Sequence, residues 1–525
     1  MRWATASVLI AVLSTTLFAQ ELDHHDHAAA ASYGNVNFVT SCSPAVKDDF
    51  NRVVAMLHSF EYDTARAAFL KIAEKQPSCA IAHWGAAMTY FHGAWGEADP
   101  ENGAKEAAKA RELAASNPTT TAREKAYIEA VSAIYSEPNA SVHERARKFA
   151  AAMEKVYQTY PDDDEAAIFY AVALYDGAGS DQSYANQRRC GEILEPLFKK
   201  LPNHPGIAHY LIHCYDNPVL ARQGLSAARE YAKIAPDSAH ATHMPSHIFV
   251  RLGLWQDVID SNLQSIKVAQ RGAPPCHERG SELHVMHFLQ FAYLQLGRQK
   301  NARSDAEQAS ALPTDHGCES GAYIAGSYAL DAHDWEMVNQ LDLQRFANQA
   351  DPPDILLTAI GVAAARTGNL ARAQQAEDAL AKVKDESAQK VGSVAGMNAS
   401  SLELAAWIAQ AQHDSAKALD LMRQAEQAGG LPAWAQPLPV EQLGDLLMEQ
   451  HKPEQALEAY RKALENTANL FNDLYGAARA AKAAHQTDVA AAYYRKLLEI
   501  AGTGDREEIA ASREELETLK ASGAE

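Results

Sequence analysis

The hydrophobic and polar positions of this chain follow the period of amphipathic helices, and β-branched runs are few. A small apolar residue followed four positions later by an aromatic one recurs at Ala65 and Phe69, at Ala456 and Tyr460, and at Ala490 and Tyr494. The last two pairs are 34 residues apart. A small residue lets two helix backbones approach, and the aromatic ring fills the gap to the next helix pair. The pattern predicts helical hairpins repeated along the chain.

Turn signals mark further copies of this unit at 253–255, 297–298, 368–370 and 413–414. The spacing between units is 34 residues in places and 44 or 45 elsewhere, so some units carry longer helices or loops. A single hairpin is too small to bury its own apolar face, and stacking on neighbours supplies the missing core. We therefore expect an all-α fold, a right-handed solenoid of helical hairpins.

The unit resembles the tetratricopeptide repeat (TPR), and the resemblance covers most of residues 42–500. It is strongest at 50–77 and 441–496. The likeness is to TPR proteins of the exported bacterial type, here with a histidine-bearing repeat array. It implies a TPR-like superhelix in which the first helix of each hairpin lines a concave groove, the surface that contacts ligands. A peptide or partner protein is the ligand class that such a groove implies.

The chain divides by composition into four parts. Residues 1–20 read as a signal peptide, with Arg2 before a short apolar run and a small residue at Ala19. Residues 21–40 read as a flexible terminus rich in His and Ala, 41–350 as an N-terminal TPR-like array, and 351–525 as a C-terminal TPR array with a capping helix. An uncleaved anchor is the alternative for residues 1–20, but their apolar segment is short for a span.

Export to the periplasm or the exterior follows from the signal peptide. No later stretch has 18 consecutive apolar residues, so we expect no membrane insertion of the mature chain. The formal net charge is −20, and no Lys/Arg cluster offsets it. An acidic surface repels phosphate backbones, which argues against nucleic acid as a partner.

Six cysteines remain in the exported chain, and six allow 15 pairings. Contacts in a repeat array are made between neighbouring helices, which favours pairing in sequence order. We therefore expect the disulfides Cys42–Cys79, Cys190–Cys214 and Cys276–Cys318. The alternative is free buried cysteines that pack as small apolar residues.

Histidines occupy one register across three successive repeats. His243 and His287 each stand ten residues before a turn glycine, and His209 stands 34 residues before His243. A second histidine follows four positions later at His213 and His247, and another precedes by three at His240 and His284. Offsets of 0, 3 and 7 residues span about 60° of a helix, so these positions form one stripe. Phe249 and Leu252 lie on the opposite, apolar face, which places the histidines on the groove side.

Local signals support helices here, with one exception. Pro205 after Asn203 suits a helix start before His209. Pro245 fits only if its helix begins near Thr242, which would leave His240 outside that helix.

Histidines at i and i+4 converge on one cation, and imidazole sets suit transition metals such as copper, zinc or iron. We therefore expect a metal-binding groove formed by His209, His213, His243, His247, His284 and His287, with Met244 and Met286 hinting at copper. His240 and His92 are weaker members of the groove, and Glu282 is a candidate ligand or base. No HExxH or complete finger motif occurs.

Three alternatives stay open. The groove could recognise a peptide or partner protein without metal, as an interaction scaffold. The same histidines could serve a metalloenzyme with Glu282 as base, although a binding protein is favoured over an enzyme. The histidines could also be structural. Tyr175-Asp176 and Tyr215-Asp216 recur at helix ends, where we expect the carboxylates to form caps and turns.

Overall fold

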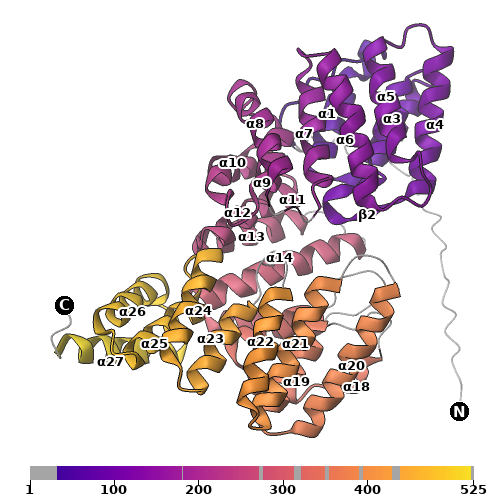
Figure 1. Cartoon of the computed structure of the whole chain (residues 1–525). Coiled ribbons are helices and arrows are strands. Elements are labelled where there is room, and N and C mark those ends of the chain that lie inside the picture. The colour runs from indigo at the N-terminus through magenta and orange to yellow at the C-terminus, as the bar shows by residue number, and fades with distance from the viewer. Residues whose placement is uncertain are drawn as a thin grey trace, which may run out of the picture. The chain divides into compact units, whose positions relative to one another are not determined.

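The computed structural model describes residues 32–521 apart from 180, 182, 271–275, 312–320, 349–353, 390–393 and 429–437. Within its helices, the side chains of 276–282, 310–311, 383–389 and 394–398 are also left out. Residues 32–525 form one compact unit. The expected all-α fold is confirmed: helices pack on their sequence neighbours throughout this unit, as a TPR-like solenoid of stacked hairpins (Figure 1).

The first part of the described chain contains eight α-helices and two very short strands. The strands β1 (Phe91–His92) and β2 (Glu97–Ala98) form an antiparallel pair. Two short 3₁₀ helices are η1 (Pro44–Val46) and η2 (Gly93–Trp95). The α-helices are α1 (Lys47–His58), α2 (Tyr62–Lys75), α3 (Ala80–Met88), α4 (Pro100–Ser116), α5 (Ala122–Ile134), α6 (Val142–Thr159), α7 (Asp164–Asp176) and α8 (Ala185–Lys200).

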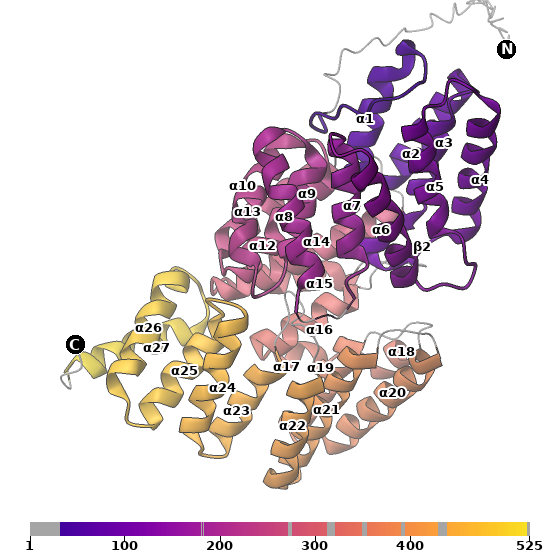
Figure 2. The same cartoon turned by 45° about the horizontal axis from the view of Figure 1, so that its top comes forward.

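The next helices carry the histidines of interest. They are α9 (Pro205–Tyr215), α10 (Ala221–Ile234), α11 (Ala239–His243), α12 (Pro245–Arg251), α13 (Trp255–Ala269) and α14 (Cys276–Gln295). Helix α12 contacts both α9 and α10, and α13 packs against α11, α12 and α14 (Figure 2).

The remaining helices continue the array. They are α15 (Gln299–Ala311), α16 (Gly321–Ala332), α17 (Trp335–Asn339), α18 (Leu343–Ala347), α19 (Asp354–Arg366), α20 (Leu370–Gln389), α21 (Val394–Ala411), α22 (Ser415–Ala428), α23 (Pro439–Glu449), α24 (Pro453–Asn466), α25 (Phe471–Ala483), α26 (Thr487–Ala501) and α27 (Glu507–Ala521). None of the helices among the described residues is both long and apolar enough to cross a membrane.

The repeat contact predicted from the small and aromatic positions is present. Tyr460 on α24 is 1% exposed, and its ring lies against Gly444 on α23 and Gly476 on α25. A Cβ atom at Gly444 or Gly476 would come within 2.6 or 2.4 Å of that ring, so glycine is required on both sides. In the N-terminal hairpin, Phe69 lies against Gly85 in the same way. The interlocking of one ring with neighbouring backbones explains how hairpins too small for a core stabilise one another.

The turns between paired helices share one backbone geometry. Gly253, Gly297 and Gly368 adopt left-handed φ angles of 64°, 66° and 83°. At the first of these, the Leu254 amide donates to the Phe249 carbonyl at 2.9 Å, a typical closing bond of a helix C-terminus. The equivalent position of the first hairpin is Phe60, with φ of 58° and the Glu61 amide bonded to Met56. A phenylalanine in this conformation is strained, because its Cβ crowds the backbone.

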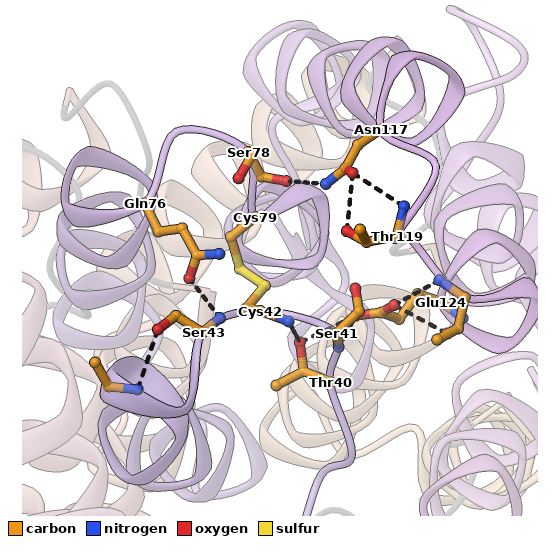
Figure 3. The surroundings of a disulfide bond; sticks show 12 residues. Thr40, Ser41, Cys42, Ser43, Gln76, Ser78, Cys79, Asn117, Thr119 and Glu124 are labelled. Carbon is orange, nitrogen blue, oxygen red and sulfur yellow. Dashed lines mark hydrogen bonds between the residues drawn. A yellow bond between two sulfur atoms is a disulfide. The ribbon is translucent and has the colours of Figure 1, made fainter.

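Residues 33–40, expected to belong to a flexible terminus, lie as an extended segment against the core. Phe38 is fully buried and stacks on Trp84 with 5.1 Å between ring centroids. The disulfide Cys42–Cys79 and the amide of Ser43, which donates to Gln76 at 2.7 Å, attach the end of this segment to the α2–α3 hairpin (Figure 3). Glu124 accepts from the Ser41 amide at 2.8 Å.

The apolar core falls into two large clusters. One extends from Phe38 to Leu296 and includes Leu470, and the other extends from Ala322 to Leu519. The histidine-bearing helices α9 to α12 lie in the first cluster, so their side chains are set in a continuous apolar environment.

Candidate metal centre

Two histidine triads form where α9, α11, α12 and α14 meet. The first triad is His209, His213 and His240, and the second is His243, His247 and His284. In each triad, one ligand atom from each histidine lies within 4.8 Å of the others. Each triad takes an i, i+4 pair from one repeat and its third histidine from the next. That third residue is the one thirteen positions before the turn glycine.

The helix boundaries explain why His240 belongs to the first triad. Ser238 caps α11, so this helix begins at Ala239, earlier than the sequence suggested. Met244 keeps a helical conformation between α11 and α12, and Pro245 stands in the first turn of α12, where no amide donor is needed. The expectation that Pro245 excludes His240 from the helix was wrong.

In the first triad the Nε2 atoms converge. Nε2 of His209 lies 3.1 Å from Nε2 of His213 and 3.0 Å from Nε2 of His240. On the other side of the His209 ring, Nδ1 lies 2.7 Å from the carbonyl oxygen of His58. A carbonyl can only accept, so Nδ1 of His209 donates and Nε2 carries a lone pair.

In the second triad, two Nδ1 atoms are bound in the same manner. Nδ1 of His243 lies 2.7 Å from Oδ1 of Asn262, whose amide nitrogen donates to a backbone carbonyl. Nδ1 of His247 lies 3.0 Å from a carboxylate oxygen of Asp216, and Arg251 donates to the other oxygen at 2.9 Å. Both Nδ1 atoms therefore donate, and both Nε2 atoms are left as acceptors.

Those two Nε2 atoms, of His243 and His247, lie 3.1 Å apart. Two lone pairs at this separation repel one another unless a proton or a cation lies between them. Nitrogens bound to one ion at 2.0–2.1 Å with angles of 90–110° are separated by roughly 2.9–3.4 Å. The observed separations in both triads fall in that interval, and hydrogen bonds on the distal nitrogens are the usual support of metal-bound histidine.

Burial keeps the imidazoles of the triads neutral. It lowers the pKa of His213 and of His284 to about 3, with neighbouring histidines as the next cause. It also lowers the pKa of His209, His240 and His243 well below the usual value. Neutral imidazole is the form that binds metal.

The triads adjoin one another. After burial, the charges that lower the pKa of His240 belong to His213 of its own triad and to His247 and His284 of the other. His240 and His243 also stand three residues apart on α11, so one helical segment contributes to both sites.

One phenylalanine covers each triad. The Phe60 ring lies 4.4, 5.5 and 5.5 Å from the rings of His209, His213 and His240. Phe288 lies 5.0, 4.9 and 5.0 Å from those of His243, His247 and His284. The strained backbone of Phe60 thus coincides with a functional contact, as is typical of such outliers.

Other expected ligands lie elsewhere. His287 forms a hydrogen bond to Ser327 at 3.2 Å and packs on Tyr323, so its assignment to the metal set was wrong. It would begin a third i, i+4 pair, but position 291 is Phe291, so no partner exists. His92 bonds the carbonyl of Thr89 and stacks on Tyr62, outside both triads. The side chain of Glu282 lies outside the described residues.

The methionines and the groove also differ from expectation. Met244 is buried, and Met286 packs on a separate small apolar cluster; neither belongs to a triad. The histidines were expected on an open groove, and this was wrong: His209 is 0% and His243 3% exposed, because the helices of adjacent repeats close over them. Phe249 is buried, as its apolar face predicts, and Leu252 is partly buried.

Two residues that orient the ligands were missed. Asp216 was expected to cap a helix, but its carboxylate binds His247 and Arg251. Burial alone would raise its pKa, but Arg251 and His247 hold the pKa well below the usual range. Asn262 occupies the repeat position where Phe69 and Tyr460 are aromatic, and it is fully buried. A polar residue at that position was the signal available in the sequence.

A third buried cluster contains His58, Glu165 and His204. Nε2 of His58 and Nε2 of His204 each lie 3.0 Å from a different oxygen of Glu165. Burial would raise the pKa of Glu165, but the two histidines hold it well below the usual range. The N–H donors and carboxylate acceptors match here, so this cluster is a hydrogen-bonded network. It also fixes His58, whose carbonyl orients His209.

The described cysteines form two of the three expected disulfides. Cys42 pairs with Cys79, and Cys190 pairs with Cys214, which directly follows His213. The Cys276 side chain and Cys318 lie outside the described residues.

Comparisons with known proteins identify no family. No family model matches the chain, and no curated protein matches it. Among solved structures, human IFIT1 dimer with m7Gppp-AAAA is 12% identical with a TM-score of 0.37, over 86% of this chain and 88% of that one. Yeast Tom70 is 12% identical with a TM-score of 0.36, over 91% of this chain and 95% of that one. At such low similarity we base no argument about ligand or activity on these proteins.

Proposed function

We propose that this protein binds two transition-metal ions, one in each histidine triad, within a scaffold of helical repeats. The observation that carries the proposal is the pair of Nε2 acceptors of His243 and His247, 3.1 Å apart, with both Nδ1 atoms already donating to oxygen. A cation satisfies these facing lone pairs at once, and matching Nε2 contacts recur in the first triad.

The ligand chemistry favours copper, zinc or iron. Each triad offers imidazole nitrogen alone, which suits these metals, whereas magnesium and calcium prefer oxygen ligands. Three protein ligands leave a coordination position open, as in catalytic sites. We nevertheless place metal binding before catalysis, because no base has been located beside the triads among the described residues.

Two further elements belong to the proposal. The paired cysteines support an exported protein, since disulfides persist in oxidising compartments. Stacked helical repeats present extended surfaces, so a partner peptide or protein is the second candidate ligand.

Elemental analysis of the untagged mature protein, dialysed against Cu²⁺ or Zn²⁺, tests the proposal. We expect two ions per chain. The double variant His213→Ala/His240→Ala should retain one ion, and so should His243→Ala/His247→Ala. His287→Ala is the matched control: it removes a buried histidine of the same helix stripe and should retain two. Wild-type protein that takes up no metal, or triad variants that bind as much as the control, would overturn the proposal.

A further inference from the structure

A small cavity lies next to the first triad, on the other side of Phe60. Its volume is about 30 Å³ for the centres of water-sized molecules, and its walls include Phe60, Tyr62, Phe169, Tyr210 and Asp176. One water requires about 10–15 Å³ by this measure, so the cavity accepts a group of two or three heavy atoms. Phe60 therefore separates this cavity from the histidine rings.

The polar group in this wall that lacks a partner is the carboxylate of Asp176. Its Oδ1 is sealed from solvent and has no hydrogen-bond partner, although the residue as a whole is partly exposed. Burial raises the pKa of this carboxyl to about 8, which marks an environment without a compensating cation. Buried carboxylates are normally paired, so an unpaired one beside a cavity calls for a ligand.

The walls specify the charge of that ligand. Aromatic faces carry negative electrostatic potential and attract cations, most strongly where water is excluded. A single carboxylate among aromatic rings offers too few oxygens for a calcium or magnesium ion, which needs six or more. We propose that the cavity binds the head of a primary ammonium ion, with Asp176 as its counterion and the aromatic rings around its first carbon.

This site is independent of the metal proposal, because its carboxylate and rings are present without any ion. The ammonium head can belong to a small free amine or to a lysine side chain. Calorimetric titration of the EDTA-treated full chain with ethylamine, n-butylamine and an acetylated, amidated lysine peptide distinguishes the two sources. Binding of an alkylamine assigns the site to free amines, and binding of the peptide alone assigns it to lysine. Ethanol, of similar size but neutral, is the ligand control.

Three variants test the role of the carboxylate. Asp176→Asn keeps the shape and removes the charge, and should weaken amine binding at least tenfold. Gly93→Ala keeps the charge, but its Cβ would meet Oδ2 of Asp176 at 2.3 Å and push the carboxylate aside, so it should also weaken binding. Asp162→Asn, at an exposed position, should bind as wild type does. Circular dichroism confirms folding of each variant. Equal affinity for ethanol, undiminished binding by Asp176→Asn, or no binding of any amine would overturn the proposal.

Discussion

The histidine triads and the His58–Glu165–His204 network lie in the same array, and both bury three polar side chains. In the network, N–H donors meet carboxylate acceptors, so every Glu165 oxygen has a partner. In the triads, like atoms meet, with Nε2 facing Nε2 at 3.0–3.1 Å. A buried polar cluster is stable by itself when donors and acceptors match, and it requires a cation when only acceptors converge. The number of clustered histidines therefore says less about metal than the partner of each second nitrogen.

Two carboxylates in the N-terminal half repeat this contrast. Two histidines hold the pKa of Glu165 well below its usual range, against the effect of burial. Burial raises the pKa of Asp176 to about 8, with no partner to oppose it. The four predictions below test the contrast between matched and unmatched groups, beginning with the largest effect.

Glu165→Ala should lower the free energy of unfolding by about 3–5 kcal/mol, because it leaves two buried histidines without their shared partner. The loss should be the same with and without metal, since the network holds no ion. Urea unfolding in EDTA measures it. Glu192→Ala removes an exposed ion pair and should cost less than about 1 kcal/mol. A loss for Glu165→Ala as small as for this control would remove the distinction between network and triads.

Metal should stabilise the triads and leave the network unaffected. At a free metal concentration 100 times the dissociation constant, each occupied triad adds about 2.7 kcal/mol to the free energy of unfolding. His247→Ala should lose one such increment, and His287→Ala should keep both. Thermal unfolding with and without Zn²⁺ gives the increments. If the two variants gain equally from metal, the second triad is not a metal site.

Asp176 should make stability depend on pH in the direction opposite to Glu165. Its pKa is about 8 in the folded protein and near 3.8 in the unfolded chain, so the folded protein retains a proton that the unfolded chain has lost. Stability therefore falls as pH rises from about 4 to 8. The charge-bearing neighbours Tyr62, Tyr175 and Tyr210 have a raised pKa and stay neutral in this interval.

Asp176→Asn removes this dependence. Between pH 5 and pH 6, its stability relative to wild type should rise by about 1.4 kcal/mol, which chemical denaturation at the two pH values measures. A constant difference between the two proteins would mean that the Asp176 carboxyl is ionised in the folded state.

Phe60 should show the smallest effect, through its backbone. Phe60→Gly and Phe60→Ala both lose the ring over the first triad, but only glycine adopts a φ of 58° without strain. The glycine variant should therefore be more stable than the alanine variant by about 1 kcal/mol, the reverse of the order in a helix. The corresponding pair at Phe69, inside α2, should show the helical order. The same order at both positions would argue against strain at Phe60.

The fold could be predicted from the sequence because its signal is local and repeated. Tyr460 with Ala456, and the turn glycines Gly253 and Gly297, each recur at a fixed distance, and the structure places them as the pattern requires. The burial of the histidines could not be predicted in the same way. It depends on Phe60 and Phe288, which arrive from other turns of the array and cover rings that the helical period alone places on an open face.

The site was predictable in its histidines but not in their grouping. Register along the repeat identified five of the six triad members as metal ligands and gave His240 a weaker role. Whether His240 or His287 completes a set depends on where α11 begins and on the residue four positions later, both of which require the backbone. Asp216 and Asn262 orient ligands across helices, and no spacing within one helix reveals such a partner.

The single helical turn that holds both His240 and His243 has an evolutionary consequence. Inserting or deleting one residue between them would rotate one histidine by about 100° relative to the other. One such event would dismantle the first triad or the second, and no compensating shift in α11 could restore both. The two triads therefore share one reading frame of the helix, and a lineage that tolerates a length change at this turn abandons the pair as a unit.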